Sequence, residues 1–169
     1  MFDGPFPNRS AFDASIERLA APDDPLCYAI VDRTSRLAVG RAALMRMKPV
    51  HRVIEIGNIV YSPQLRRTRG ATEAMYLLGR YVFDTLGYRR YEWKCNALNE
   101  PSRLAALRLG FTFEGIFRQH MIVKGRSRDT AWYSMIDSEW PALRARFERW
   151  LAPENFDAQS RQRRKLSVI

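Results

Sequence analysis

The chain has 169 residues, of which 46% are hydrophobic and 27% charged, and a formal net charge of +10. These values fit one globular domain with a sizeable core and exclude a disordered chain. Most of the basic residues are arginine, and the positive balance favours anionic partners such as nucleotides, phosphorylated cofactors, nucleic acid or acidic lipid. The alternative is that arginine-rich usage is a general habit of the source.

Signals for targeting and for metal binding are not evident. No apolar run approaches the roughly 18–20 residues of a membrane span, and the N-terminus lacks the basic-then-apolar order of a signal peptide. We therefore expect a cytoplasmic protein with no membrane partner. Cys27 and Cys95 are expected to be reduced. Together with His51 they are too scattered for metal-ligand spacing, so we expect no metal.

Hydrophobic periodicity and turn residues predict the elements in chain order. A first helix begins at Ser10 and ends at Pro22–Pro25, and strands follow over residues 26–32, 37–47 and 53–61. Next come a helix over 71–86, a strand over 88–96, a short helix over 100–109, strands over 111–123 and 129–136, and a final helix from Ser138. We expect residues 1–152 to form one mixed α/β (α+β) domain, a layer of sheet flanked by helices, and residues 153–169 to form a basic, mobile tail.

The run IEIGNIVYSPQLRRTRGATEA, residues 54–74, carries the clearest chemical signal. An alternating strand passes through Tyr61 and an arginine-rich turn into a helix that opens at Gly70-Ala71-Thr72. Backbone N–H groups and the positive end of the helix dipole converge at such a junction, and Arg66, Arg67 and Arg69 add full charges. The segment therefore predicts a site for a phosphate-bearing ligand.

The same run resembles the signature of the GNAT superfamily of N-acetyltransferases, in which Arg or Gln is followed by two residues, Gly, one residue, and Gly or Ala. Aligned without a gap, Arg66 takes the first position and Ala71 the last. Arg69 occupies the place of the first glycine, where its side chain could obstruct the approach of the backbone to a pyrophosphate. The alternative is a turn one residue shorter, in which Gly70 fills that role.

Two further segments are similar to the RimJ/RimL-like (ribosomal-protein-alanine acetyltransferase) branch of that superfamily. Asn99-Glu100-Pro101-Ser102, followed by RLAALRLGF, resembles the Asn-x-x-Ser that opens a short helix there, and FTFEGIFRQHMIVKG resembles the closing strands. The resemblance covers roughly residues 26–137. It implies a GNAT-like, mostly antiparallel sheet flanked by helices, here lacking the usual first strand and helix.

The resemblance also implies roles for individual residues. Asn99 would bind the pantetheine arm of acetyl-CoA and Ser102 would hydrogen-bond the departing thiolate, although either side chain could instead cap the helix. A backbone N–H on the preceding strand would polarise the thioester carbonyl. The residues expected to bind acetyl-CoA are Ile59, Val60, Tyr61, Arg66, Arg67, Thr68, Arg69, Gly70, Ala71, Thr72, Asn99 and Ser102.

Attack by an ammonium substrate also requires a general base. Glu55 is the first candidate, because histone-acetylating relatives carry their base glutamate at the matching point of this strand. The alternative is an outward carboxylate that pairs with an arginine such as Arg52 or Arg41. His120 is the second candidate, since imidazole titrates near neutral pH, and its alternative is a plain strand residue without a partner. Ser102, Glu55 and His120 are therefore the candidate catalytic residues.

The leading hypothesis is an acetyl-CoA-dependent N-acetyltransferase that acts by direct attack in a ternary complex. Its acceptor would be a primary amine, either a peptide N-terminus or a small molecule, and a homodimer is an open expectation. Two alternatives remain. A degenerate GNAT fold would bind CoA without catalysis. A basic nucleic-acid-binding module would use Arg161, Arg163, Arg164 and Lys165, although the sequence lacks a recognisable nucleic-acid motif.

Overall fold

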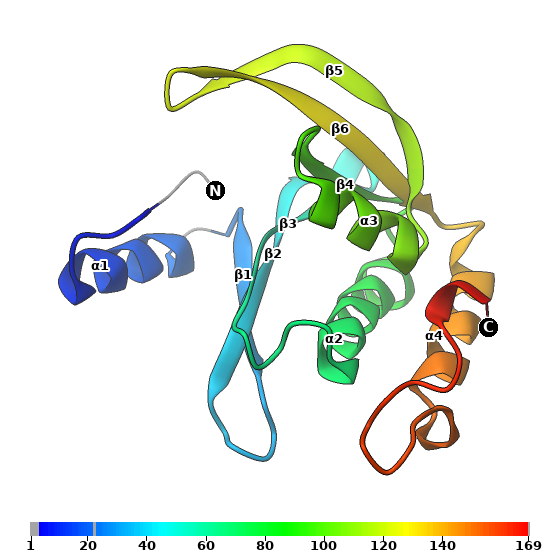
Figure 1. The fold of residues 1–169 in the computed structure, drawn as a ribbon. Helices are drawn as coiled ribbons and strands as arrows, with labels where there is room; N and C mark the ends of the chain where they lie inside the picture. Colours follow the sequence, from blue (N-terminus) through cyan, green and yellow to red (C-terminus); the bar gives the residue numbers. More distant parts are fainter. Residues whose placement is uncertain (1–3, 22, 169) are drawn as a thin grey trace.

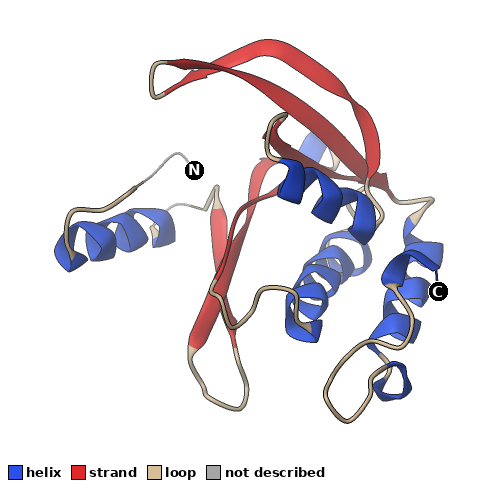
Figure 2. Cartoon of the chain, viewed as in Figure 1, coloured by secondary structure: helices blue, strands red, loops and turns tan. Residues whose placement is uncertain are grey.

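A computed structural model describes residues 4–21 and 23–168. Its centre is a six-stranded sheet in the spatial order β1-β2-β3-β4-β6-β5 (Figures 1 and 2). Neighbouring strands are antiparallel, except that β3 and β4 run parallel. The strands span Leu26–Val31, Ala38–Lys48, Val53–Tyr61, Arg90–Asn96, Thr112–Val123 and Arg126–Ile136. The prediction of a mixed, mostly antiparallel sheet is confirmed.

The described residues form four α-helices around this sheet, and none of their helices is long and apolar enough to cross a membrane. Figure 1 shows α1 beside the β1 edge, while α2, α3 and α4 lie together on the other side. After α2 the chain continues through a π-helical turn, residues 81–85, before it enters β4. The helices span Arg9–Ala20, Arg69–Arg80, Glu100–Leu109 and Trp140–Leu151.

Two helices begin earlier than their apolar periodicity predicts, because polar side chains cap them. The Asn8 side chain, not that of Ser10, caps α1 by accepting a hydrogen bond from the Ala11 N–H at 2.9 Å. The Thr68 hydroxyl caps α2 in the same way, so that helix begins at Arg69. Pro22, predicted to help end α1, lies outside the described residues.

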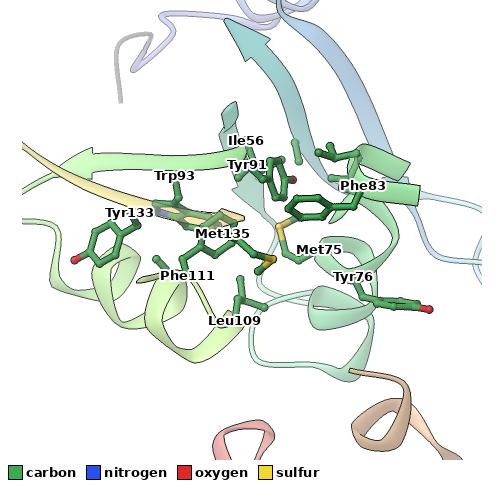
Figure 3. Close-up of a cluster of buried hydrophobic side chains, with 14 of the residues drawn as sticks. Ile56, Met75, Tyr76, Phe83, Tyr91, Trp93, Leu109, Phe111, Tyr133 and Met135 are labelled. Carbon is green, nitrogen blue, oxygen red and sulfur yellow. The ribbon is translucent and has the colours of Figure 1, made fainter. Parts of the chain in front are cut away.

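One cluster of buried side chains joins the sheet to α2, α3 and α4 (Figure 3). Burial alternates along β4, where Tyr91, Trp93 and Cys95 are buried among the helices and the intervening residues are less covered. Ile56 of β3 and Met75 of α2 belong to the same cluster. The alternation directs Trp93 toward the helices and the neighbouring Lys94 toward the opposite face of the sheet.

The parallel pair of strands marks a gap in the sheet. Residues pair from Val53 with Arg90 to Ile56 with Trp93, whereas β3 continues to Tyr61 and β4 to Asn96. Figure 1 shows β1–β3 and β4–β6 diverging beyond this point. Backbone groups on the facing edges of the two strand ends are therefore directed toward the gap rather than toward a neighbouring strand.

The segment after α4 is packed against the domain. Leu166 is 1% exposed, and the buried Asn155 side chain donates hydrogen bonds to the carbonyls of Trp150 and Arg164. Trp150 in turn donates its indole N–H to Gln162 at 3.0 Å. A few buried side chains therefore anchor this segment, although its polar composition predicts a mobile tail. We call residues 153–168 the C-terminal segment.

Candidate functional site

A cavity of about 650 Å³ lies where the β3–α2 turn, α3 and the C-terminal segment meet, and we call it the arginine-lined cavity. Four arginines line it: Arg67 and Arg69 from the turn and the start of α2, Arg108 from α3, and Arg161 from the C-terminal segment. The described lining contains no aspartate or glutamate. Guanidinium groups bind phosphate oxygens through paired N–H donors. The cavity therefore suits a ligand that carries several phosphates.

The β3–α2 turn is shaped by its own side chains. The Thr68 hydroxyl accepts from the Ala71 N–H at 3.2 Å and donates to the Leu65 carbonyl at 2.8 Å. Arg67 has a left-handed backbone conformation with φ of 61°. The N–H groups of Arg69 and Gly70 lie at the positive end of α2, beside the cavity. Because the first N–H groups of a helix lack intrahelical acceptors, these two can donate to a ligand.

Arg69, which stands where the family signature has glycine, is tied to the C-terminal side of the molecule. Its guanidinium donates a hydrogen bond to the Leu151 carbonyl and lies over the Phe156 ring, 4.9 Å from the ring centre. Arg66, in contrast, donates from Nε to the Tyr61 carbonyl at 3.2 Å and is not part of the cavity lining. Of the three arginines predicted in the turn, Arg67 and Arg69 therefore line the cavity, whereas Arg66 hydrogen-bonds the backbone of the turn.

A wall from α3 faces the turn. Arg108 donates to the Thr72 hydroxyl at 3.0 Å and lies over the Trp150 ring, so its guanidinium is held in the cavity. The neighbouring Tyr61 donates to the Ala71 carbonyl at 3.4 Å. Burial raises the pKa of Tyr61 to about 12, against the opposing charge of Arg108, so its phenol remains neutral.

A second cavity of about 270 Å³ occupies the gap between β3 and β4, and we call it the strand-gap cavity. Trp93 lines both this cavity and the arginine-lined one. Ile59 and Val60 line it, and both lie at a β-bulge. On β2, Arg41 pairs with Val60 and Ala43 pairs with Gly57, so an advance of two residues along β2 is matched by three residues along β3. A bulge leaves backbone groups without ladder partners and directs them to a new position.

Ser102 and Asn99 lie together at the start of α3 and line the strand-gap cavity. The Asn99 side chain caps α3 by accepting from the Ser102 N–H at 3.3 Å, which is the capping role that the local sequence left open. The Ser102 hydroxyl accepts from the Trp93 indole at 3.0 Å and retains its proton for donation. Burial raises the pKa of the Cys95 thiol, and a hydrogen bond with Ser102 opposes that shift. The Ser102 hydroxyl therefore lies within hydrogen-bond distance of the Cys95 sulfur atom.

Glu55 is buried rather than outward-facing, with 5% exposure. Its carboxylate accepts from Lys94 Nζ at 2.9 Å and lies 3.3 Å from Arg46 Nε, so Glu55 does pair with an arginine, but that arginine is Arg46 rather than Arg52 or Arg41. Burial raises the pKa of Glu55, while Lys94 and Arg46 act in the opposite direction.

His120 has a partner, contrary to the expectation of an isolated strand residue. Its Nδ1 lies 2.9 Å from the Thr130 hydroxyl, and its ring meets Phe117 edge-on. A third cavity of about 80 Å³, which we call the Glu55 cavity, is lined by both His120 and Glu55. This cavity shares Lys94 and other lining residues with the strand-gap cavity. The two candidate bases therefore lie at the end of the gap away from the arginine-lined cavity.

Sequence patterns gave no sign of several lining residues. Arg108 lies in a short helix whose periodicity indicates only packing, and Phe156 and Gln162 lie in a segment of polar composition. These side chains reach the cavity through tertiary contacts between α3, α4 and the C-terminal segment. Within residues 4–21 and 23–168, no group of three or more His, Cys, Asp or Glu side chains is placed to hold a metal ion.

Comparison with known proteins adds family information to this geometry. A family model described as "Acetyltransferase (GNAT) domain" matches residues 2–112. A crystal structure of a GCN5-related N-acetyltransferase from Brucella melitensis is 53% identical, with a TM-score of 0.96, and the match covers 99% of this chain and 76% of that one.

Two curated relatives come from Bacillus subtilis. One, named "Uncharacterized N-acetyltransferase YoaA", is 30% identical over 109 residues, which are 64% of this chain and 61% of YoaA. The other, named "Putative ribosomal N-acetyltransferase YdaF", is 31% identical over 101 residues, 60% of this chain and 55% of YdaF. The matches thus span less than two thirds of the length of these curated relatives.

Proposed function

The chain belongs to the GNAT family of acetyltransferases, and on that premise we propose that it moves an acetyl group from acetyl-CoA to a primary amine in a ternary complex. The observation that carries this proposal is that the arginine-lined and strand-gap cavities share a lining residue at the gap in the sheet. Trp93 lines both, so a ligand held by the arginines can extend past it between β3 and β4. A long coenzyme with phosphates at one end and a thioester at the other fits that path.

The arginine-lined cavity is the proposed position of the coenzyme phosphates. Arg67, Arg69 and Arg108 supply full charges, and the N–H groups of Arg69 and Gly70 supply the helix N-terminus. Arg161 extends this binding surface into the C-terminal segment, beyond the residues that the family signature indicates. Arg69 thereby belongs to the binding wall rather than to an obstruction of the turn.

The strand-gap cavity is the proposed position of the pantetheine arm and the acetyl group. Asn99 lines its α3 side, and Ile59 and Val60 line its β3 side next to the bulge. A backbone N–H released by the bulge would polarise the thioester carbonyl, as in an oxyanion hole. The Ser102 hydroxyl would donate to the leaving thiolate in place of the Cys95 sulfur that it faces now, while it continues to accept from the Trp93 indole.

The acceptor amine must lose a proton before or during its attack. Glu55 is the base that we propose first, because burial raises its pKa and its cavity adjoins the strand gap. His120 is the second, since it lines the same small cavity. The remaining contribution is orientation, because holding the nitrogen and the carbonyl carbon at attack distance can supply several kcal/mol of barrier reduction.

The finer assignment to the RimJ/RimL-like branch belongs to the same proposal. It is supported by Asn99-x-x-Ser102 with the LRLGF sequence that follows and by the similarity to YdaF, whose printed name refers to ribosomal N-acetylation. The acceptor would then be a peptide N-terminus or a small primary amine.

Two measurements test the proposal. Acetyl-CoA should raise the melting temperature of the protein, because a ligand that binds only the folded state stabilises it. Ser102→Ala should lower kcat by about 10²-fold or more with a much smaller change in acetyl-CoA affinity. Ser127→Ala is the matched control, since Ser127 is exposed on β6 and lines none of the three cavities.

The outcomes separate the readings. No stabilisation by any acyl-CoA would overturn the proposal. Stabilisation without acetylation across a broad amine panel would support the alternative of a non-catalytic CoA-binding protein.

A further inference from the structure

One lysine of the chain lines the cavities in which acetyl transfer is proposed. The sequence has four lysines, Lys48, Lys94, Lys124 and Lys165, and all of them lie within the described residues. Lys94 lines both the strand-gap cavity and the Glu55 cavity, whereas the other three line none of the three cavities. The Lys94 side chain is 9% exposed, and the other three lysines are exposed. A primary amine of the protein itself is therefore built into the proposed site.

The Lys94 ammonium lies beside the carboxylate that we propose as the first base. Lys94 Nζ donates to Glu55 Oε2 at 2.9 Å and contacts Glu92 Oε2 at 2.7 Å. It also lies over the Trp132 ring, 3.9 Å from the ring centre. An acceptor amine that Glu55 deprotonates needs a position within hydrogen-bond distance of this carboxylate. Lys94 already holds such a position.

The backbone of Lys94 lies where the gap in the sheet opens. The parallel pairing of β3 with β4 ends at Ile56 with Trp93, so Lys94 is the first residue of β4 beyond that pairing. The bulged part of β3, where the thioester carbonyl is proposed to lie, borders the same strand-gap cavity. A rotation that moves the side chain from Glu92 and Trp132 into this cavity would bring its amine to the thioester.

From these contacts we infer that Lys94 is a modification site, because the protein acetylates this side chain itself when no acceptor is present. The inference rests on the proposed acetyl transfer and identifies an internal acceptor for it. The Lys94 ammonium gives one proton to Glu55, and the neutral amine attacks the thioester carbonyl. The C–N bond forms and the C–S bond breaks, a second proton leaves the nitrogen, and the thiolate receives one through Ser102. Acetyl-CoA and the ammonium thus become acetyl-lysine, CoA and one released proton.

The burial of Lys94 makes the position of acetylation diagnostic. Acetyl-CoA in solution also modifies lysines without catalysis, and that reaction favours exposed side chains such as those of Lys48, Lys124 and Lys165. A coenzyme bound in the strand-gap cavity instead places the thioester and the Lys94 amine on one molecule, which replaces a bimolecular reaction with an intramolecular one. We therefore expect Lys94 to be acetylated at least about tenfold faster than any exposed lysine.

The experiment incubates the wild-type protein with acetyl-CoA in the absence of an acceptor and follows acetylation of each lysine by peptide mass spectrometry. The rate constant at Lys94 should not depend on protein concentration, because the reaction is intramolecular. Excess CoA, which competes for the same cavities, should slow acetylation of Lys94 and leave the exposed lysines unaltered. Lys94→Arg keeps the positive charge and should lose this acetylation. Lys48→Arg, at an exposed lysine on β2, is the matched control and should retain it.

The outcomes distinguish this inference from the function on which it rests. Absence of acetyl-CoA binding, measured as the shift in melting temperature, would overturn the acetyltransferase proposal itself. Acetyl-CoA binding with Lys94 unmodified, or modified no faster than the exposed lysines, would overturn only the inference of self-acetylation. A rate constant at Lys94 that rises in proportion to protein concentration would also overturn it, because one molecule would then be acetylating another.

Discussion

Gly40 offers a sharp test of how the β3–α2 turn is supported. Gly40 lies on β2 and pairs with Tyr61 at the end of β3. A Cβ atom at this position would be 2.8 Å from the Val60 carbonyl oxygen and 2.8 Å from Leu65 Cδ2. The leucine side chain can rotate, but the backbone oxygen cannot move without displacing β3. Gly40→Ala should therefore push β3 and the β3–α2 turn away from β2.

The magnitude follows from two opposing effects. Forcing an extra carbon into a packed site typically costs about 1–3 kcal/mol. Replacing glycine with alanine also restricts the unfolded chain, which returns about 0.4–1 kcal/mol to stability. At Gly40 the clash dominates, so the free energy of unfolding should fall by about 1–2 kcal/mol. At Gly70 a Cβ would meet only Leu65 Cδ1 at 3.6 Å and Thr68 Oγ1 at 3.7 Å, which are ordinary contacts.

Urea denaturation followed by tryptophan fluorescence measures both variants on one scale. Gly40→Ala should lower the midpoint at an unchanged slope, whereas Gly70→Ala should equal or slightly exceed the wild type. Gly40→Ala should also weaken acetyl-CoA binding, because the displaced turn carries Arg67 and the start of α2. If Gly40→Ala is as stable as Gly70→Ala, the reasoning that β2 supports the turn by close packing is wrong.

Three other changes test separate parts of the structure. Arg108→Gln removes a charge held in the arginine-lined cavity by its bond to Thr72 and should weaken acetyl-CoA binding about tenfold in isothermal titration, with a shallower salt dependence. Trp140→Phe removes the 2.6 Å hydrogen bond to Asp84 and should lower the free energy of unfolding by about 1.5 kcal/mol in urea; an unchanged value would contradict it. Leu166→Ala leaves a cavity at a side chain 1% exposed and should cost about 2–5 kcal/mol, whereas a mobile C-terminal segment would make it neutral.

The fold was predictable because its elements are locally encoded. Alternating apolar residues mark β3 and β4, and the apolar stripe predicted for α2 continues past the end of that helix at Arg80, because buried Val82 lies in the π-helical turn that follows. Errors arose where one polar side chain overrides the pattern, as when Asn8 and Thr68 begin helices earlier than their apolar residues indicate. The C-terminal segment was predicted as mobile because buried Leu166 is a small part of a polar composition.

Some residues of the candidate site are close together in sequence, and we call these its local part. Others come together only through tertiary packing, and we call these its assembled part. The β3–α2 turn and the start of α3 are each continuous in sequence, so local motifs could indicate Thr68 and Ser102, both of which line cavities. The assembled part could not be predicted, because Arg108 joins the turn only through the packing of α3 on α2. The partners of Glu55 are also assembled, since Lys94 comes from β4 and Arg46 from β2.

Arg69 and the C-terminal segment contact each other, although nothing in the sequence relates the two. An arginine at the glycine position of the signature needs a place for its guanidinium outside the turn. The Leu151 carbonyl and the Phe156 ring provide that place, and the chain after them returns to contribute Arg161 to the same cavity. The side chain that departs from the family pattern therefore helps to position the segment that completes the cavity wall.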